Sequence, residues 1–337
     1  MKQNEDGRLR MEDGFRHLQS SIFHLRPVLI AGPTAVGKSE IALRLAEQFG
    51  GEIISADSMQ VYRGLDIGTA KPLPTDRARV PHHLLDILEL TESFDAAQFT
   101  RLAHRAVVEI QSRGHVPIFC GGTGLYFKAF LEGLGQAPSA DAKLRAELEA
   151  APMENLLAEL REHDPAAYEG IDKQNPRRVI RAVEVIRLTG KPFSDQRADW
   201  NTPHASRNTH HFFCLLRSPD DLRIRINARV DAMFKRGLVN ETRELLKHGL
   251  AENKTAMQAI GYRQVVEHLR GERSLPETIE LVKIRTRQFA KRQLTWFRAQ
   301  KNLEWIELKP DESPGKCSQK ICKAILSRGV MEDNGPR

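Results

Sequence analysis

Short apolar runs alternate with amphipathic stretches through the first 140 residues. The runs have strand length and end at small or polar residues, whereas the stretches between them repeat apolar residues every three or four positions. This pattern predicts strands over 28–31, 52–57 and 116–120, with a weaker candidate over 84–88. It predicts helices after residue 38 and from Ser93 or Asp95 to Gln111, and a loop over 61–74. Alternation of this kind is typical of an α/β fold with a parallel sheet, which binds ligands at the carboxyl ends of its strands.

The middle of the chain has helical periodicity without strong strands. Helices are predicted over 143–150, 153–163 and 176–189, followed by loop-like sequence over 191–208. An apolar strand over 212–216 then resumes the earlier pattern. Further helices are predicted over 222–234, 239–247, 262–269 and 276–300, and a closing strand over 303–308.

These changes predict a helical insertion within an α/β core. The core is assigned to 27–140 and 206–310 and the insertion to 141–205. Residues 1–26 are polar and charged, which predicts a disordered extension with Met11 as a candidate start. Residues 311–337 are expected to form a polar, peripheral tail.

The first apolar run leads into a G-x-x-x-x-G-K-S motif, and a helical pattern follows at once. The motif consists of Gly32, Pro33, Thr34, Ala35, Val36, Gly37, Lys38 and Ser39. A strand, this loop and a helix form a phosphate site, in which backbone N–H groups and Lys38 bind phosphate and Ser39 can reach Mg²⁺. The motif predicts a bound di- or triphosphate and leaves its chemistry open.

Composition narrows the class of protein. The chain has 337 residues, 40% of them hydrophobic and 28% charged, and no apolar run as long as a membrane span. Its four scattered cysteines favour reduced thiols in a cytoplasmic protein. The net charge of +7 favours a polyanionic partner. Nothing in the sequence indicates an obligate second subunit, so we expect a monomer.

Polar residues at the strand ends are candidates for the chemistry. Asp57 follows the second strand and is either a general base beside bound phosphate or an aspartate that organises magnesium or caps a helix. Thr123 lies in a Gly-Gly-Thr-Gly turn after another strand, where its hydroxyl could donate to a phosphate oxygen. Taken alone, that turn is weak support.

Two helices carry clustered cations. Arg225 and Arg229 are four residues apart on one helix face, which suits a diphosphate or simply a solvated surface. Arg287, Lys291 and Arg298 share a face of a later helix, a plausible track for a phosphate backbone. The neighbouring Trp296 and Phe297 more often pack in a core than stack on a base.

The chain resembles the tRNA dimethylallyltransferases (tRNA isopentenyl transferases, the IPP transferase family) of bacterial type. The resemblance runs from about residue 27 to 308 and rests on the phosphate motif and on segments 55–72, 121–126, 259–264 and 286–293. It implies a P-loop NTPase-like fold and transfer of a dimethylallyl group from dimethylallyl diphosphate to N6 of the adenosine 3′ of the tRNA anticodon (position 37). It also implies that the P-loop binds the prenyl diphosphate with Mg²⁺, while ATP binding stays open.

By position, the resemblance assigns roles to three residues: Asp57 as the base at N6, Thr123 at the bridging region of the diphosphate, and Arg225 at the leaving group. It further implies contacts of the tRNA anticodon stem-loop with Asp57, Ser58, Met59, Gln60, Thr123, Arg145, Arg177, Arg178, Val179, Ile180, Arg181, Gln258, Ala259, Ile260, Gly261, Tyr262 and Arg263. The helical insertion is expected to close on that stem-loop. Residues 1–26 have no counterpart in the family motifs, and the C-terminal zinc finger of eukaryotic members is absent.

Two alternative functions from other classes of protein remain, together with a third that is closely related to tRNA prenyl transfer. A P-loop kinase acting on a small metabolite would explain the phosphate loop and Asp57, but not the basic helix. An RNA-binding module that uses a nucleotide only as a switch would explain the charge, but not the placement of Asp57 and Thr123. A plant-like adenylate prenyltransferase is the nearest relative, and the arginines of the insertion favour tRNA over adenylate.

Overall fold

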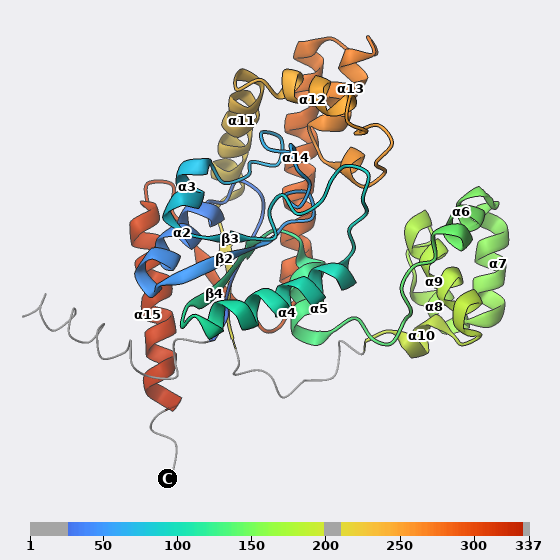
Figure 1. Ribbon diagram of the computed structural model, residues 1–337, viewed down its shortest axis with the longest axis horizontal. Helices are drawn as coiled ribbons and strands as arrows, with labels where there is room; N and C mark the ends of the chain where they lie inside the picture. The colour runs from blue at the N-terminus through green and yellow to red at the C-terminus, as the bar shows by residue number, and fades with distance from the viewer. Residues whose placement is uncertain (1–25, 199–209, 333–337) are drawn as a thin grey trace, which may run out of the picture. The chain divides into compact units, whose positions relative to one another are not determined.

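A computed structural model describes residues 26–198 and 210–332 (Figure 1). The predicted N-terminal extension lies outside the described residues apart from Arg26. The chain divides into two compact units, one running to Phe127 and resuming after Ala205, and the other comprising Lys128–Ala205. Among the described residues no helix is both long and apolar enough to cross a bilayer.

A six-stranded sheet with the order β3-β2-β4-β1-β5-β6 organises the first unit. Each neighbouring pair is parallel. The central strand pairs on both sides, with Ile30 opposite Cys120 and opposite Phe213. The strands are β1 (Val28–Ala31), β2 (Gly51–Ala56), β3 (His82–His83), β4 (Val116–Gly121), β5 (His211–Leu216) and β6 (Glu304–Glu307).

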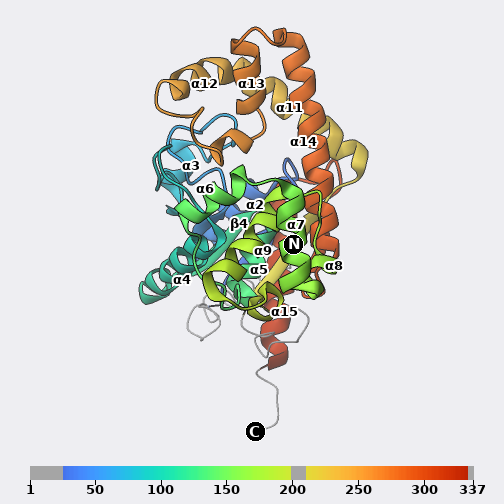
Figure 2. The same ribbon diagram turned by 90° about the vertical axis from the view of Figure 1, so that its right-hand side faces the viewer.

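Helices cover both faces of this sheet, as a parallel sheet requires. They are α2 (Lys38–Phe49), α3 (Pro74–Arg79), α4 (Ala96–Ser112), α5 (Gly124–Glu132), α11 (Pro219–Lys235), α12 (Leu238–Leu246), the 3₁₀ turn η3 (Ala256–Gln258), α13 (Tyr262–Leu269), α14 (Leu275–Arg298) and α15 (Pro314–Glu332). Phe213 lies in the core beside α2, whereas its neighbour Phe212 stacks on Phe127 of α5 on the opposite face. Farther from the sheet, α13 packs against both α12 and α14 (Figure 2).

Local sequence explains where the longer helices begin. Asp95 caps α4, because its carboxylate accepts a hydrogen bond from the Gln98 N–H and the Gln98 side chain bonds back in a capping box. Ser274 and Glu277 cap α14 in the same way. The predicted start of the first of these helices is therefore confirmed at Asp95.

The predicted strand over 84–88 is wrong. The parallel ladder stops at β3, which covers only His82 and His83. Leu84 and Asp86 have φ values of 60° and 53°. This left-handed backbone cannot continue a strand, although the apolar composition resembles one.

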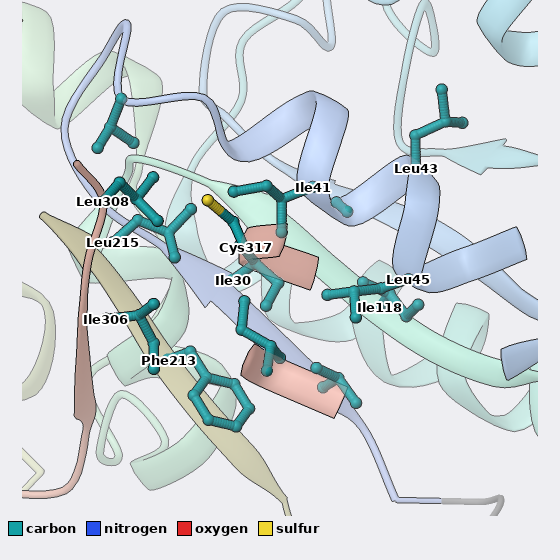
Figure 3. Packing of buried hydrophobic residues seen from close by; sticks show 14 of the residues in the cluster. Ile30, Ile41, Leu43, Leu45, Ile118, Phe213, Leu215, Ile306, Leu308 and Cys317 are labelled. Atoms are coloured by element: carbon teal, nitrogen blue, oxygen red, sulfur yellow. The ribbon is translucent and has the colours of Figure 1, made fainter. Parts of the chain in front are cut away.

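The expected polar tail beyond residue 310 is also wrong, because α15 packs on the core. Cys317 and Ile321 are fully buried, and Cys322 and Ile325 nearly so. Their spacing places them on one helix face against α2, and Figure 3 shows Cys317 beside Ile30 and Ile41. An amphipathic stripe explains this burial despite the polar average of the segment.

The second unit is a small helical assembly. Its helices are α6 (Ala142–Ala150), α7 (Met153–His163), α8 (Pro165–Gly170), α9 (Pro176–Thr189) and α10 (Phe193–Gln196). The three predicted helices are found here, while α8 and α10 were not predicted. The segment before α6 belongs to this unit, because Gln136 N–H donates to the Gln196 carbonyl at 2.9 Å and Arg181 bonds the Pro138 carbonyl at 2.5 Å.

Candidate active site

The loop after β1 forms a compact turn that leads into α2. Gly32 has φ +142°, and a Cβ there would lie 2.8 Å from the Leu215 carbonyl oxygen. Only glycine therefore lets the loop leave the sheet next to β5. Gly37, with φ +110°, precedes α2, so the helix N-terminus faces the turn.

Lys38 folds back over this turn. Its Nζ donates to the carbonyls of Gly32 at 2.9 Å and Pro33 at 2.8 Å. The pKa of Lys38 is lowered to about 8, mainly by burial and in part by the nearby Arg229, against the opposite effects of Cys120 and Asp57. An anion bound in the loop would stabilise the cationic form and raise this pKa again.

Three arginines contact consecutive residues of the loop. Arg225 Nε donates to the Ala35 carbonyl at 2.9 Å, and Arg229 Nη1 donates to Thr34 Oγ1 at 3.1 Å. Arg217 Nε donates to the Val36 carbonyl at 2.8 Å, while its Nη1 pairs with Asp221 at 2.7 Å. Each guanidinium has five N–H donors, so Arg225 and Arg229 retain donors for an anion.

Arg217 is a site residue that was not predicted. Its position offered a signal, because it directly follows the apolar run that becomes β5 and so lies at the same sheet edge as the loop. Burial lowers the pKa of both Arg225 and Arg229, so the loop gathers cations whose charge is incompletely compensated. Such an arrangement favours a polyanion.

Asp57 and Thr123 lie side by side at the ends of two paired strands. Ala56 of β2 is opposite Gly121 of β4, so the residues that follow meet at one edge. Thr123 Oγ1 accepts a hydrogen bond from the Ser58 N–H at 3.3 Å, and Asp57 Oδ1 accepts from the Met59 N–H at 2.9 Å. The Thr123 hydroxyl proton remains available for donation.

A cavity of about 270 Å³ joins the phosphate loop to Asp57. Lys38, Ser39 and Asp57 line its polar side, while Leu43, Ile53 and Phe289 contribute apolar surface. Arg225 does not line this cavity; it lines a second hollow, whose wall also includes Lys38 and Ser39. The cavity can therefore hold a group with an anionic end and an apolar end next to a carboxylate.

The comparisons with known proteins agree with this geometry. The family model described as IPP transferase matches residues 60–300. The chain is 47% identical over 291 residues to the tRNA dimethylallyltransferase of Geobacter sulfurreducens, covering 83% of this chain and 91% of that protein. The chain belongs to the IPP transferase family.

Solved structures of the family have the same fold. The full-length tRNA isopentenylpyrophosphate transferase of Bacillus halodurans is 38% identical, with a TM-score of 0.67 over 92% of this chain and 100% of that one. A eukaryotic dimethylallyltransferase acting on tRNA is 27% identical, with a TM-score of 0.71 over 92% of this chain and 80% of that one. The predicted resemblance and the P-loop α/β fold are confirmed.

Of the expected RNA-contacting residues, Asp57 and Gln60 line the cavity. The Gln60 amide is held at both ends: its Oε1 accepts a hydrogen bond from Ser55 Oγ at 2.9 Å, and its Nε2 donates to the carbonyls of Thr69 at 3.1 Å and Ala70 at 3.5 Å. Gln60 thus ties β2 to the loop over 61–74. That loop is found as predicted and forms part of the cavity wall.

Segment 258–263, in the sheet-containing unit of this IPP transferase, presents few side chains at the surface. Gln258 and Arg263 are exposed, whereas Ala259 and Tyr262 are buried. The Tyr262 hydroxyl donates to Glu241 at 2.6 Å, and Glu241 accepts the Ile67 N–H at 2.9 Å. The buried part of the segment therefore anchors the loop that lines the cavity.

In the helical unit, some of the residues expected to contact RNA (Arg145 and 177–181) are likewise buried or paired, and others are exposed. Val179 and Ile180 are buried in the core of that unit, so their side chains do not reach its surface. Arg145 and Arg181 pair with the fully buried Glu184 at 2.5 and 2.7 Å. Arg177 and Arg178 are exposed.

The basic face of α14 is only partly exposed. Lys291 and Arg298 face solvent, whereas Arg287 Nη1 donates to Asn227 Oδ1 of α11 at 2.7 Å. Phe297 is fully buried and packs edge-on against Trp296, as the structural interpretation of these aromatic residues predicts.

Proposed function

We propose that this IPP transferase moves a dimethylallyl group from dimethylallyl diphosphate to N6 of the adenosine 3′ of the anticodon in tRNA, and releases diphosphate. The cavity that joins the phosphate loop to Asp57 carries this proposal. Its cationic end suits a diphosphate, its apolar surface suits a five-carbon allyl group, and its carboxylate suits an amine nucleophile. The relatives include a tRNA dimethylallyltransferase and a eukaryotic dimethylallyltransferase that acts on tRNA.

The reaction needs a base and a stabilised leaving group. The N6 amine attacks C1 of the allyl group, the N6–C1 bond forms, and the C1–O bond to diphosphate breaks. In the proposed mechanism, Asp57 accepts the proton that N6 loses. Lys38 and Arg225 stabilise the negative charge that develops on the departing diphosphate, with Thr123 donating from the Asp57 side.

The residues at the cavity fit Mg²⁺, which Ser39 would help to hold. Ser39 lines the cavity beside Lys38, and Asp57 faces the same space. The described residues hold no cluster of three or more His, Cys, Asp or Glu side chains that could bind a metal. This suits Mg²⁺, which usually takes one or two protein oxygens and completes its shell with phosphate and water. When bound, it would neutralise charge on the diphosphate.

The nucleic-acid substrate follows from charge and access. The chain carries a net charge of +7. The segments proposed to contact RNA also present exposed polar side chains: Gln258, Arg263, Arg177, Arg178 and Lys291. An adenosine in an anticodon loop can leave its stack at modest cost, because no complementary strand holds it. We propose that this base enters the cavity toward Asp57.

Product analysis tests the proposal. The protein is incubated with Mg²⁺, dimethylallyl diphosphate labelled in the allyl group, and an unmodified tRNA with adenosine 3′ of its anticodon. A matched tRNA carries guanosine at that position. Label is expected in the first RNA alone, as N6-dimethylallyladenosine after digestion. Label in neither RNA, or equal label in both, would contradict the proposal.

A further inference from the structure

A single side chain connects the two halves of the cavity. Gln293 Oε1, on α14, accepts a hydrogen bond from the Thr34 N–H of the phosphate loop at 2.9 Å. Its Nε2 donates to the Gly122 carbonyl, also at 2.9 Å. The residue is 8% exposed, so neither bond is readily replaced by water. Because one end meets a donor and the other an acceptor, the amide has only one satisfactory orientation.

The turn after β4 is shaped for this contact. A Cβ on Gly122 would lie 2.2 Å from Gln293 Nε2, and a Cβ on Gly124 would lie 2.2 Å from the Trp296 ring. Both side chains come from α14, three residues apart on adjoining faces. The glycines around Thr123 therefore let α14 approach the turn closely enough for Gln293 to reach it.

The two hydrogen-bond partners of Gln293, Thr34 and Gly122, lie in two different parts of the proposed active site. Thr34 accepts the Arg229 hydrogen bond and precedes Lys38 in the anion-binding loop. Gly122 directly precedes Thr123, whose Oγ1 accepts the Ser58 N–H beside Asp57. The β1–β4 ladder pairs Ile30 with Cys120. Gln293 connects the two segments beyond the ladder, at Thr34 and Gly122, four and two residues farther along.

We propose that Gln293 is a positioning residue that sets the distance between the diphosphate site and the base. It acts through the backbone of Thr34 and Gly122 and takes no part in proton transfer. Reacting groups misplaced by about 1 Å can lose about a hundredfold in rate. Loss of this amide should thus lower kcat far more than it weakens diphosphate binding. The inference rests on the proposed prenyl transfer.

The first test compares Gln293→Leu with Gln288→Leu. Gln288 is exposed on the same helix and bonds Arg285, so it controls for the substitution itself. Gln293→Leu is expected to lower kcat by about a hundredfold with little change in KM for dimethylallyl diphosphate, and Gln288→Leu to match the native enzyme. A kcat within twofold of native for Gln293→Leu would overturn the proposal.

A double-mutant cycle separates positioning from general loss of packing. In Gly122→Ala the new methyl group displaces Gln293, so a similar loss of kcat is expected. In the double variant Gly122→Ala/Gln293→Ala the methyl group has room. The loss of kcat in this variant should therefore be much smaller than the sum of the losses in Gly122→Ala and Gln293→Ala. Additive losses would mean that the two residues act independently, against the proposal.

Hydrogen exchange at the Thr34 amide gives a readout that does not need activity. The Thr34 N–H should exchange at least about tenfold faster in Gln293→Ala than in the native protein or Gln288→Ala. Unchanged exchange would overturn the proposal even if the protein transferred no prenyl group. A native protein without transferase activity would instead contradict the proposed function.

Discussion

The two compact units use arginine in opposite ways. In the sheet unit, Arg225 and Arg229 bond a backbone carbonyl and a threonine hydroxyl of the phosphate loop, which leaves their positive charge for an incoming anion. In the helical unit, Arg145 and Arg181 neutralise the buried Glu184. An arginine cluster in a sequence therefore indicates a polyanion site only when its partners carry no compensating charge.

The residues of 177–181, which are expected to contact RNA, differ in their surroundings. Segment 177–181 contains three arginines, but Val179 and Ile180 are in the core and Arg181 is paired with Glu184. Arg177 and Arg178 remain at the surface. Mutations at the five positions should thus separate into effects on stability and effects on RNA affinity.

The largest expected effect is at Asp57. Asp57→Asn keeps the shape of the side chain and removes the base, so kcat should fall by about 10²–10⁴-fold, while dimethylallyl diphosphate still binds. Single-turnover rates and equilibrium binding measure the two quantities. Asp95→Asn is the control, because asparagine caps α4 as well as aspartate does. A near-native rate for Asp57→Asn would remove it from the role of base.

The next effect contrasts an arginine from each unit. Arg225→Gln should lower the transfer rate by about a hundredfold, as expected for a lost donor to developing negative charge. Arg145→Gln should leave the affinity for dimethylallyl diphosphate unchanged, since its partner is Glu184. Steady-state kinetics with both substrates measure these effects. Equal losses of diphosphate affinity in the two variants would refute the contrast.

A smaller effect is expected on the stability of the helical unit. Glu184→Gln leaves Arg145 and Arg181 without their buried counter-charge and should cost about 2 kcal/mol in the free energy of unfolding. Glu159→Gln, which breaks the partly exposed pair with Arg187, should cost about 1 kcal/mol or less. Urea unfolding curves give both values. If the two costs are the same, burial of Glu184 does not determine the stability of this unit.

The smallest effect is a pH dependence at Lys38. Its pKa in the free protein lies at about 8, so it loses its charge as the pH rises through that value. The affinity for dimethylallyl diphosphate should fall by up to about tenfold between pH 8 and 9. Lys38→Met should bind weakly with no such dependence. A flat binding profile in the native protein would show that Lys38 stays charged or does not contact the anion.

Local patterns were sufficient to predict most of the elements. The bounds of α7, α9 and α13 match the predicted helices, because apolar residues at helical spacing and residues such as Pro176 and Gly190 mark both ends. The motif after β1 located the phosphate loop, and strand-end reasoning located Asp57 and Thr123. Each of these signals lies within a dozen residues of sequence.

Contacts between distant segments could not be predicted in this way. Gln293 lies 259 residues from Thr34, and no periodicity links them. The Tyr262–Glu241–Ile67 connection likewise joins three separate segments. The helix α15 was missed for another reason: its apolar stripe is narrow, and the average polarity of the segment conceals it. Long-range hydrogen bonds and narrow stripes become visible only in the folded chain.

The central claim is that the phosphate loop binds a leaving diphosphate rather than a phosphate donor. A single-turnover reaction with tRNA and dimethylallyl diphosphate, labelled separately in the allyl group and in the β-phosphate, tests it directly. We expect one equivalent of allyl label on N6 of the adenosine and all phosphate label in inorganic diphosphate. Phosphate label on the RNA, or transfer of phosphate from ATP to a small acceptor without prenylation, would contradict it.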